Sequence, residues 1–322
     1  MTTLAEQCKE AGLQSAAELT RITGASKETL TNWMKEKPKL FEVVLQGALQ
    51  TEKNIVAKRF IQLFEKHGVH RNQIPEFFGH GLTFLDVDDY KKLLAKLTPE
   101  ILNAACEIFK VRVQWLQGVD NVIYSIHDFY KHPQDYAEFI SQFTDGSRIL
   151  AKLVISANAY DAESGDTANA VLVLEEDIGY IHDEPIQRYH VCGNWNIKYW
   201  KCKPDLTACI AMTLKQGIYM HGWEKSDNIS AFCRGEGFME DLYNLPFAVK
   251  RDWLFKQRLD NWHPDEWIYK PESFLEGIDE GKFGKASAIQ RLLYYFDKGY
   301  LETGYHRKNA QEEFILALEK YR

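Results

Sequence analysis

Two short helices joined by a tight turn are predicted over residues 16–38, and no other stretch constrains the N-terminal fold as strongly. Gly24 stands between the two runs, where a backbone with positive φ costs least. Ser26 is a favourable N-cap for the second helix, in which Leu30 and Trp33 lie three residues apart on one face. The spacing therefore predicts one buried face and an opposite face of polar side chains.

This layout resembles the helix-turn-helix of phage-repressor-type transcriptional regulators, of the Cro/C1 or XRE-like kind. The resemblance is carried by Thr20, Gly24, Leu30 and Trp33 and concerns only the N-terminal part of the chain. It implies that the second helix, residues 26–37, enters the major groove of double-stranded DNA. An ordinary helical hairpin is the alternative.

The same resemblance gives roles to the polar side chains of the second helix. Asn32 is the side chain expected to read adenine, while the lysines neutralise phosphates and the hydroxyl groups bond to phosphate or base. The predicted DNA-binding residues are Ser26, Lys27, Glu28, Thr29, Thr31, Asn32, Lys35 and Lys37.

The charge balance requires any contact with DNA to be local. The chain has 39 Lys and Arg against 46 Asp and Glu, and the formal net charge of −7 opposes nonspecific binding of nucleic acid by the whole molecule. Residues 1–50 carry as many Lys and Arg as Glu, and most of these cations lie between residues 27 and 39. We therefore expect affinity to come from a homo-oligomer, such as a dimer, or from tandem sites.

Several features argue against other classes of protein. No apolar run of about 18 residues is present, which predicts no membrane contact. Residues 1–12 lack the basic and apolar regions of a signal peptide, so a cytoplasmic location is expected. No C-x-x-C pair occurs, so we expect free thiols, no metal site and no cofactor. The cysteines are Cys8, Cys106, Cys192, Cys202, Cys209 and Cys233.

A second helical domain is predicted after the first. Residues 98–120 resemble the closing helices of Cro/C1-type repressor domains. Asp86, Asp88 and Asp89 stand where a reading helix belongs, and their charge would repel phosphate. We therefore expect a degenerate copy that serves packing or dimerisation. The alternative is contact with backbone phosphates through His67, His70, Arg71 and His80.

The last part of the chain changes to an α+β pattern. Runs of β-branched residues with strand length surround a helix that Pro204 opens, and the pattern turns helical after residue 241. The predicted strands are residues 149–160, 170–181, 218–225 and 229–237, together with a strand within residues 186–200 that is followed by a bend at Gly193 and Asn194. The predicted helices are residues 204–214, 288–300 and 309–321.

Two groups of residues in this last part are candidates for chemistry. Residues 175–177 and 182–184 form an acidic set with one histidine, suited to a divalent cation or to acid–base work, unless these carboxylates are simply solvated. Aromatic and polar side chains suggest a pocket for a planar or cationic ligand, with an aromatic core as the alternative. The residues of this ligand-binding set are Trp195, Tyr199, His221 and Trp223.

The sequence as a whole predicts an α+β multidomain fold, with all-α helix-turn-helix units followed by a sheet domain and a helical C-terminus. The predicted domains are residues 1–50, 51–145 and 146–322. No phosphate-binding loop, nucleophile elbow or zinc-protease motif occurs, so we do not expect an enzyme. The expected function is bacterial or phage-related transcription regulation, in which the C-terminal body senses a small-molecule effector or sets the oligomeric state.

Two other functions remain open from the sequence. One is a helical protein-interaction adaptor of phage or mobile-element origin, which the acidic balance favours. The other is an enzyme with an unrecognised acidic site near residues 175–184.

Overall fold

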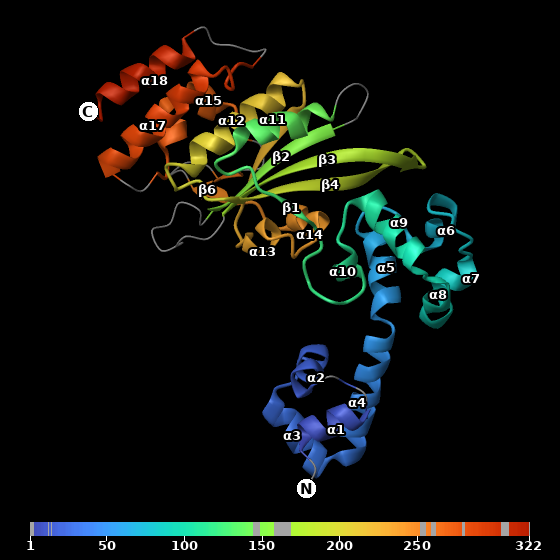
Figure 1. The fold of residues 1–322 in the computed structure, drawn as a ribbon. Coiled ribbons are helices and arrows are strands. Elements are labelled where there is room, and N and C mark those ends of the chain that lie inside the picture. The colour runs from blue at the N-terminus through green and yellow to red at the C-terminus, as the bar shows by residue number, and fades with distance from the viewer. Residues whose placement is uncertain are drawn as a thin grey trace. The chain divides into compact units, whose positions relative to one another are not determined.

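The computed structural model describes residues 3–11, 13, 15–143, 149–157, 169–251, 256–258, 262–278, 281–303 and 309–321. These residues form the predicted α+β multidomain architecture (Figure 1). The chain divides into two compact units. The first comprises Met1–Glu65, His70–Asn103 and Leu116–Val119, and the second comprises Lys66–Val69, Ala104–Trp115 and Asp120–Arg322. The predicted domain boundaries near residues 50 and 145 stay predictions.

The first four helices share one small core. Cys8, Leu19 and Leu30 are fully buried in it, and Phe41 is nearly so. The helices are therefore amphipathic elements held by packing, because helices of this length are marginal alone in water. Their bounds are α1 (Leu4–Ala11), α2 (Ala16–Thr23), α3 (Lys27–Glu36) and α4 (Pro38–Lys53).

The turn between α2 and α3 has the predicted chemistry. Gly24 adopts a left-handed conformation with φ 68°, and its N–H donates to the carbonyl oxygen of Thr20 at 2.9 Å. Ser26 is the N-cap of α3, where its Oγ accepts a hydrogen bond from the backbone N–H of Thr29 at 3.1 Å. Pro38 opens α4, so the chain leaves α3 at the predicted place.

A second set of short helices follows. Phe60, Phe64 and Phe78 pack with ring centroids 4.9–5.7 Å apart and form the centre of its core. Asp89 separates two of these helices, because its carboxylate accepts a hydrogen bond from the backbone N–H of Lys91 and caps the second of the two. The bounds are α5 (Ile55–Glu65), η1 (Arg71–Gln73), α6 (Ile74–Phe77), α7 (Phe84–Asp88), α8 (Tyr90–Lys96), α9 (Pro99–Phe109) and α10 (Val113–Leu116).

The second unit is built on a five-stranded mixed sheet with the order β1-β4-β3-β2-β5. The two outer pairs, β1 with β4 and β2 with β5, are parallel, and the inner pairs are antiparallel. Leu172 and Val173 of β3 are both fully buried, so this strand is covered on both faces. The bounds are β1 (Ile126–His127), β2 (Ile149–Ser156), β3 (Ala170–Ile181), β4 (Glu184–Trp195) and β5 (Tyr219–Lys225).

Helices cover one face of this sheet and bury the largest core of the unit. The helix α12 contacts β4 and β5, and α11 and α17 pack against it (Figure 1). Every residue from Cys202 to Thr213 is buried, including the charged Lys203 and Asp205, so α12 is enclosed on all sides. The bounds are α11 (Pro133–Ser141), α12 (Cys202–Lys215), α15 (Glu266–Tyr269), α16 (Pro271–Leu275), α17 (Gly281–Asp297) and α18 (Ala310–Glu319).

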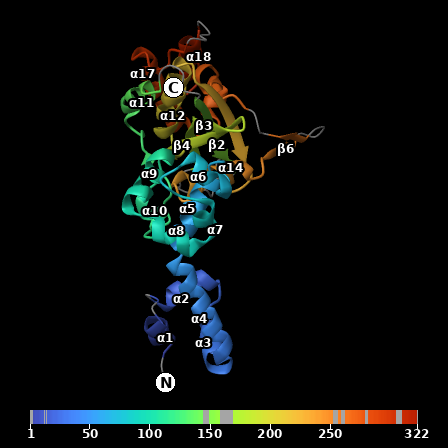
Figure 2. The same cartoon turned by 90° about the vertical axis from the view of Figure 1, so that its right-hand side faces the viewer.

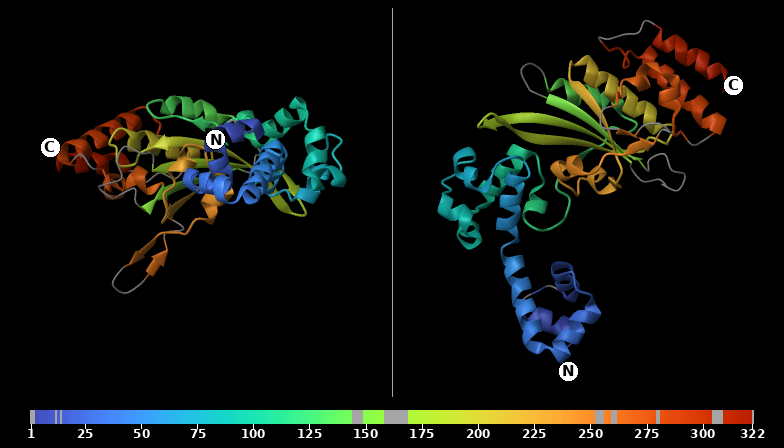
Figure 3. Two further views of the ribbon diagram at one scale, coloured as in Figure 1. Left: turned by 90° about the horizontal axis from the view of Figure 1, so that it is seen from below. Right: turned by 180° about the vertical axis from the view of Figure 1, so that it is seen from behind.

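Two predictions were wrong, one for residues 229–237 and one for the stretch after residue 241. Residues 229–237 were predicted as a strand, but they contain the helix α13 (Ser230–Cys233), because Asn228 accepts a hydrogen bond from the N–H of Ser230 and caps a turn there. The stretch after residue 241 is not all helical. After α14 (Met239–Asn244), β6 (Val249–Arg251) and β7 (Lys256–Arg258) form a separate hairpin that extends away from the sheet (Figure 2 and Figure 3).

None of the helices in the described part of the chain combines the length and the apolar character needed to cross a membrane.

Candidate functional site

The helix α3 presents the predicted polar surface. Its buried side centres on Leu30, which is fully buried, with Trp33 and Met34 packed against the same core. The opposite side is open to solvent. Among the predicted DNA-binding residues, Ser26, Lys27, Glu28, Asn32, Lys35 and Lys37 are exposed, and Thr29 and Thr31 are half-buried.

The hydroxyl groups on this surface already have local partners. The Oγ atoms of Ser26 and Thr29 lie 2.9 Å apart, and the Oγ1 of Thr31 donates to the carbonyl oxygen of Lys27 at 2.7 Å. These bonds position the first turn of α3 and do not leave the hydroxyls pointing freely outward. The long polar side chains of Lys27, Asn32 and Lys35 are therefore the stronger candidates for contact with a ligand.

The helix α7 of the second set carries one buried carboxylate and two exposed apolar side chains. Asp86 is nearly buried, and its carboxylate accepts hydrogen bonds from the backbone N–H and the hydroxyl of Thr83. The helix α7 instead exposes Phe84 and Leu85, at 63% and 70% of their surface. The expected degenerate copy that serves packing or dimerisation stays a prediction.

The alternative role for the histidines of this region is partly wrong. His67 is only 2% exposed, and its Nε2 lies 3.2 Å from the hydroxyl of Tyr124, so it does not reach a phosphate. His80 stacks on Phe78 with ring centroids 4.2 Å apart. The guanidinium of Arg71 lies over the ring of Tyr90, 4.7 Å from its centroid.

The predicted acidic set is split by the sheet. Glu175 and Glu176 lie on opposite faces of β3, as neighbours in a strand must. Glu175 is buried and pairs with Lys152 at 2.7 Å, whereas His182 and Asp183 form the exposed turn of the β3–β4 hairpin. The carboxylates at 175 and 176 are therefore paired inside the protein and not solvated. No group of three or more metal-ligating side chains occurs among the described residues.

The predicted aromatic ligand set is also divided between the two faces. Trp195 is fully buried in the helix-covered core, with Tyr199 packed at its margin. His221 and Trp223 are paired in register with Lys152 and Val154, on the face opposite that core. The structure does not bring the four side chains into one pocket. The six cysteines are free and buried, as predicted.

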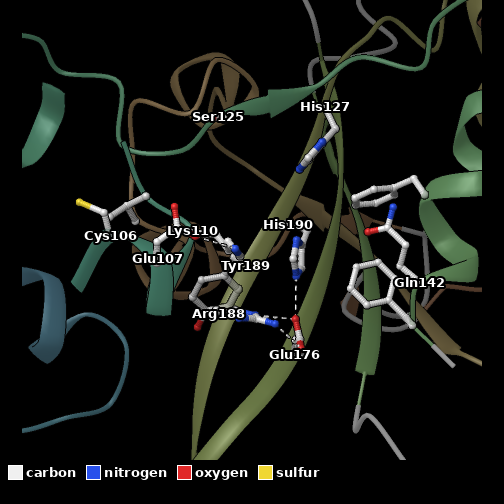
Figure 4. Close-up of a pocket in the computed structure, with 13 residues that line it drawn as sticks. Cys106, Glu107, Lys110, Ser125, His127, Gln142, Glu176, Arg188, Tyr189 and His190 are labelled. Carbon is white, nitrogen blue, oxygen red and sulfur yellow. Dashed lines mark hydrogen bonds and ion pairs between the residues drawn. The ribbon is translucent and has the colours of Figure 1, made fainter. Parts of the chain in front are cut away.

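A cavity of about 540 Å³ lies at the helix-covered face of the sheet, and the sequence did not indicate it (Figure 4). Its floor is formed by Glu176 of β3 and by Arg188 and His190 of β4. His127 of β1 adds an imidazole, and the end of α11 adds Phe139, Gln142 and Phe143. The volume is in the range of pockets that hold small molecules.

The floor is organised around Glu176. Arg188 donates two hydrogen bonds to its carboxylate, from Nε at 2.5 Å and from Nη2 at 2.6 Å, and Nε2 of His190 lies 2.8 Å from Oε2 (Figure 4). Burial raises the pKa of Glu176, but the bonds from Arg188 and His190 outweigh it, so the pKa is lowered from its ordinary value. Glu176 is therefore ionised at neutral pH and holds both partners in place.

The two histidines of the cavity are neutral at neutral pH. Burial lowers the pKa of His190 despite the opposing effect of Glu176, and burial, with a smaller contribution from His190, lowers the pKa of His127. The Cys106 thiol at the margin is also protonated, because burial raises its pKa to about 12. The cavity is thus equipped for hydrogen bonding and does not contain a thiolate nucleophile.

The sequence carried only a weak signal for this site. Glu176, Arg188 and His190 share a face because β3 and β4 pair in a register that places Glu176 opposite Arg188. In the sequence, Arg188, His190 and Cys192 alternate along one predicted strand. This spacing predicts that they share a face, but it does not predict which residue of another strand lies beside them.

Comparison with known proteins gives no match: no family model, no curated protein and no solved structure is significantly similar to this chain.

Proposed function

We propose that the protein is a sequence-specific transcriptional regulator that reads double-stranded DNA with α3. The observation that supports this most strongly is the α2–turn–α3 geometry. Gly24 is left-handed, Ser26 caps α3, and the exposed face of α3 carries Lys27, Asn32 and Lys35. A helix of this kind enters the major groove with its N-terminal residues first.

The charge distribution supports a local reading surface. Lys27, Lys35 and Lys37 are exposed on or next to α3, in a chain whose formal net charge is −7. Their cations neutralise phosphates beside the groove, and the amide of Asn32 bonds to the edge of adenine. Because only these three cations of the described residues lie at the proposed reading surface, binding as a homo-oligomer would add the affinity that one copy lacks. For a twofold dimer, the half-sites lie about 34 Å apart.

The second unit has a separate role in this proposal. It provides the effector-binding body, and the cavity at Glu176, Arg188 and His190 is its candidate site. We do not assign an enzymatic activity to it. Among the described residues, no hydrogen bond joins Ser125 at the cavity margin to either imidazole, so a nucleophile and base are not paired there.

The proposal is tested by selecting binding sites from a random DNA pool at near-physiological salt. The wild-type protein is expected to enrich one motif, and Asn32→Ala is expected to lose preference at one position by about 1–3 kcal/mol while keeping affinity for random DNA. Equal losses of affinity for selected and for random DNA in Asn32→Ala would show that Asn32 does not contact a base.

Salt dependence provides the second arm of this experiment. Removing Lys27 and Lys35 together is expected to reduce the slope of log affinity against log salt by about 2. The matched control is Lys91→Ala with Lys92→Ala, which removes two exposed cations from α8. An unchanged slope in the α3 variant, or an equal change in the control, would contradict the proposed reading helix.

A second candidate function is a protein-interaction adaptor. The observation that favours it is the exposure of Phe84 and Leu85 on α7, next to the carboxylates of Asp88 and Asp89. Large exposed apolar side chains with a polar rim mark protein contacts more often than DNA contacts. Failure of the DNA selection to enrich any motif would favour the adaptor.

A further inference from the structure

The cavity beside β4 contains an aromatic wall. The rings of Phe139 and His127 lie 4.6 Å apart between centroids, and the rings of Phe143 and His190 lie 4.9 Å apart. Phe143 is only half-buried, so part of this wall faces the cavity. The rings of Phe139 and Phe143 are inclined at 84° to each other, so a flat ligand gains contact area by lying against the face of one ring and meeting the edge of the other.

The charges around the cavity cancel locally. Arg188 is paired with Glu176, and Lys110 is paired with Glu107 at 3.0 Å. The two imidazoles are neutral near pH 7. An anionic ligand would meet the carboxylates of Glu176 and Glu107, and a cationic ligand would meet the guanidinium and ammonium groups. A neutral ligand avoids both costs.

Hydrogen-bonding groups along the cavity offer both donors and acceptors. The Nε2 of the neutral His190 bonds to Glu176, so Nδ1 is the ring nitrogen that can accept a hydrogen bond. Arg188 uses Nε and one hydrogen of Nη2 on the same carboxylate and has further N–H groups to donate. The exposed amide of Gln142 supplies one donor and one acceptor side.

From these three properties we infer that the cavity binds a neutral, planar nitrogen heterocycle of nucleobase or nucleoside size. The aromatic wall selects flatness, the balanced charges select neutrality, and the presence of both donors and acceptors selects a polar edge such as that of a purine or pyrimidine. The inference deepens the proposed function, because it gives the effector a chemical class. Binding at the cavity itself does not depend on DNA.

The test is isothermal titration of the full-length protein with adenosine, guanosine, cytidine and uridine, and with their 5′-monophosphates. At least one nucleoside is expected to bind with a Kd below about 1 mM, more tightly than its monophosphate. Phe143→Ala is expected to weaken binding about tenfold, because a base loses its stacking partner. Gln142→Ala, at an exposed position that does not threaten folding, is expected to weaken it several-fold.

The controls are matched in residue type. Phe283→Ala removes an exposed phenylalanine of α17, and Gln134→Ala removes an exposed glutamine of α11, both outside the cavity lining. Both are expected to bind as the wild type does. The inference is overturned if no nucleoside binds at that concentration, if the monophosphates bind more tightly, or if both cavity variants behave like the controls. The titrations contain no DNA, so their outcome does not depend on whether α3 binds DNA.

Discussion

At the scale of single residues, Lys203 is a fully buried charged group of the second unit. Its side chain is fully buried, and Nζ donates to the carbonyl oxygen of Glu276 at 2.7 Å and lies 4.4 Å from the centroid of the Trp267 ring. Burial lowers the pKa of Lys203 to about 7, although the charge of Glu276 opposes the shift. This lysine therefore couples folding to pH near neutrality.

The sign of the coupling is set by the unfolded chain, in which a lysine titrates near 10.4. Between about pH 7 and pH 9.5 the unfolded state holds the proton and the folded state does not, so the free energy of unfolding rises with pH, by up to about 3 kcal/mol. Below the pKa that Lys203 has in the folded state, the lysine is protonated in both states, and it no longer makes the free energy of unfolding depend on pH. Buried thiols such as Cys106, whose pKa is raised by burial, act in the opposite direction, because unfolded thiols ionise at about pH 8.5. Denaturant unfolding at the two pH values is therefore expected to show the contribution of Lys203 as a rise in the wild-type free energy of unfolding relative to that of Lys203→Met. Equal pH dependence in the two proteins would contradict it.

At the scale of elements, one buried carboxylate joins α12 to α17. The oxygens of Asp205, which is fully buried, accept hydrogen bonds from Nε and Nη2 of Arg291 at 2.6 and 3.0 Å and from the hydroxyl of Tyr295 at 2.6 Å. The backbone N–H of Lys131, just before α11, donates to the same group at 2.8 Å. The position of three helices therefore depends on this group.

Removing the guanidinium of Arg291 leaves the carboxylate of Asp205 buried without its charge partner. Arg291→Met is expected to lower the free energy of unfolding by about 3 kcal/mol, because the uncompensated charge cannot return to water. Arg234→Met provides the matched control, since Arg234 pairs with Glu236 at an exposed site and such pairs contribute at most about 1 kcal/mol. Similar losses in the two variants, measured by denaturant unfolding, would show that Asp205 does not need its partner.

The elements that the sequence predicted are those with local causes. The turn at Gly24 and the cap at Ser26 follow from chemistry within a few residues. The errors have two kinds of cause. The strands β1 and β6–β7 exist through pairing that residue patterns do not show. The helix α13 follows a turn in which Asn228 accepts a hydrogen bond from the N–H of Ser230, in a stretch whose apolar, β-like composition indicated a strand.

At the scale of the whole molecule, the same distinction separates the two candidate sites. The α3 surface was predictable because its residues lie on one helix, and helical spacing decides which of them face outward. The cavity was not predictable, because Glu176, Arg188, His127 and Phe143 come from three strands and the end of a helix. Only strand register and the placement of α11 bring them together.

The molecule also has separate hydrophobic cores. One core lies among α1–α4 and includes Leu30, and another lies on the helix-covered face of the sheet and includes Leu292. Because each core is closed by its own side chains, the loss of packing in one is expected to leave the other intact. The α3 surface proposed to read DNA therefore depends for its order on the small core and not on the large one.

Leu30→Ala and Leu292→Ala test this separation as a matched pair, since both leucines are fully buried. Each substitution is expected to cost about 2–5 kcal/mol in its own core. Scanning calorimetry of the full-length protein is expected to show more than one transition, with Leu30→Ala lowering the first core's midpoint and Leu292→Ala lowering the second's. DNA binding on warming is expected to be lost earlier only in Leu30→Ala. A single transition that both substitutions shift equally would show instead that the cores unfold as one.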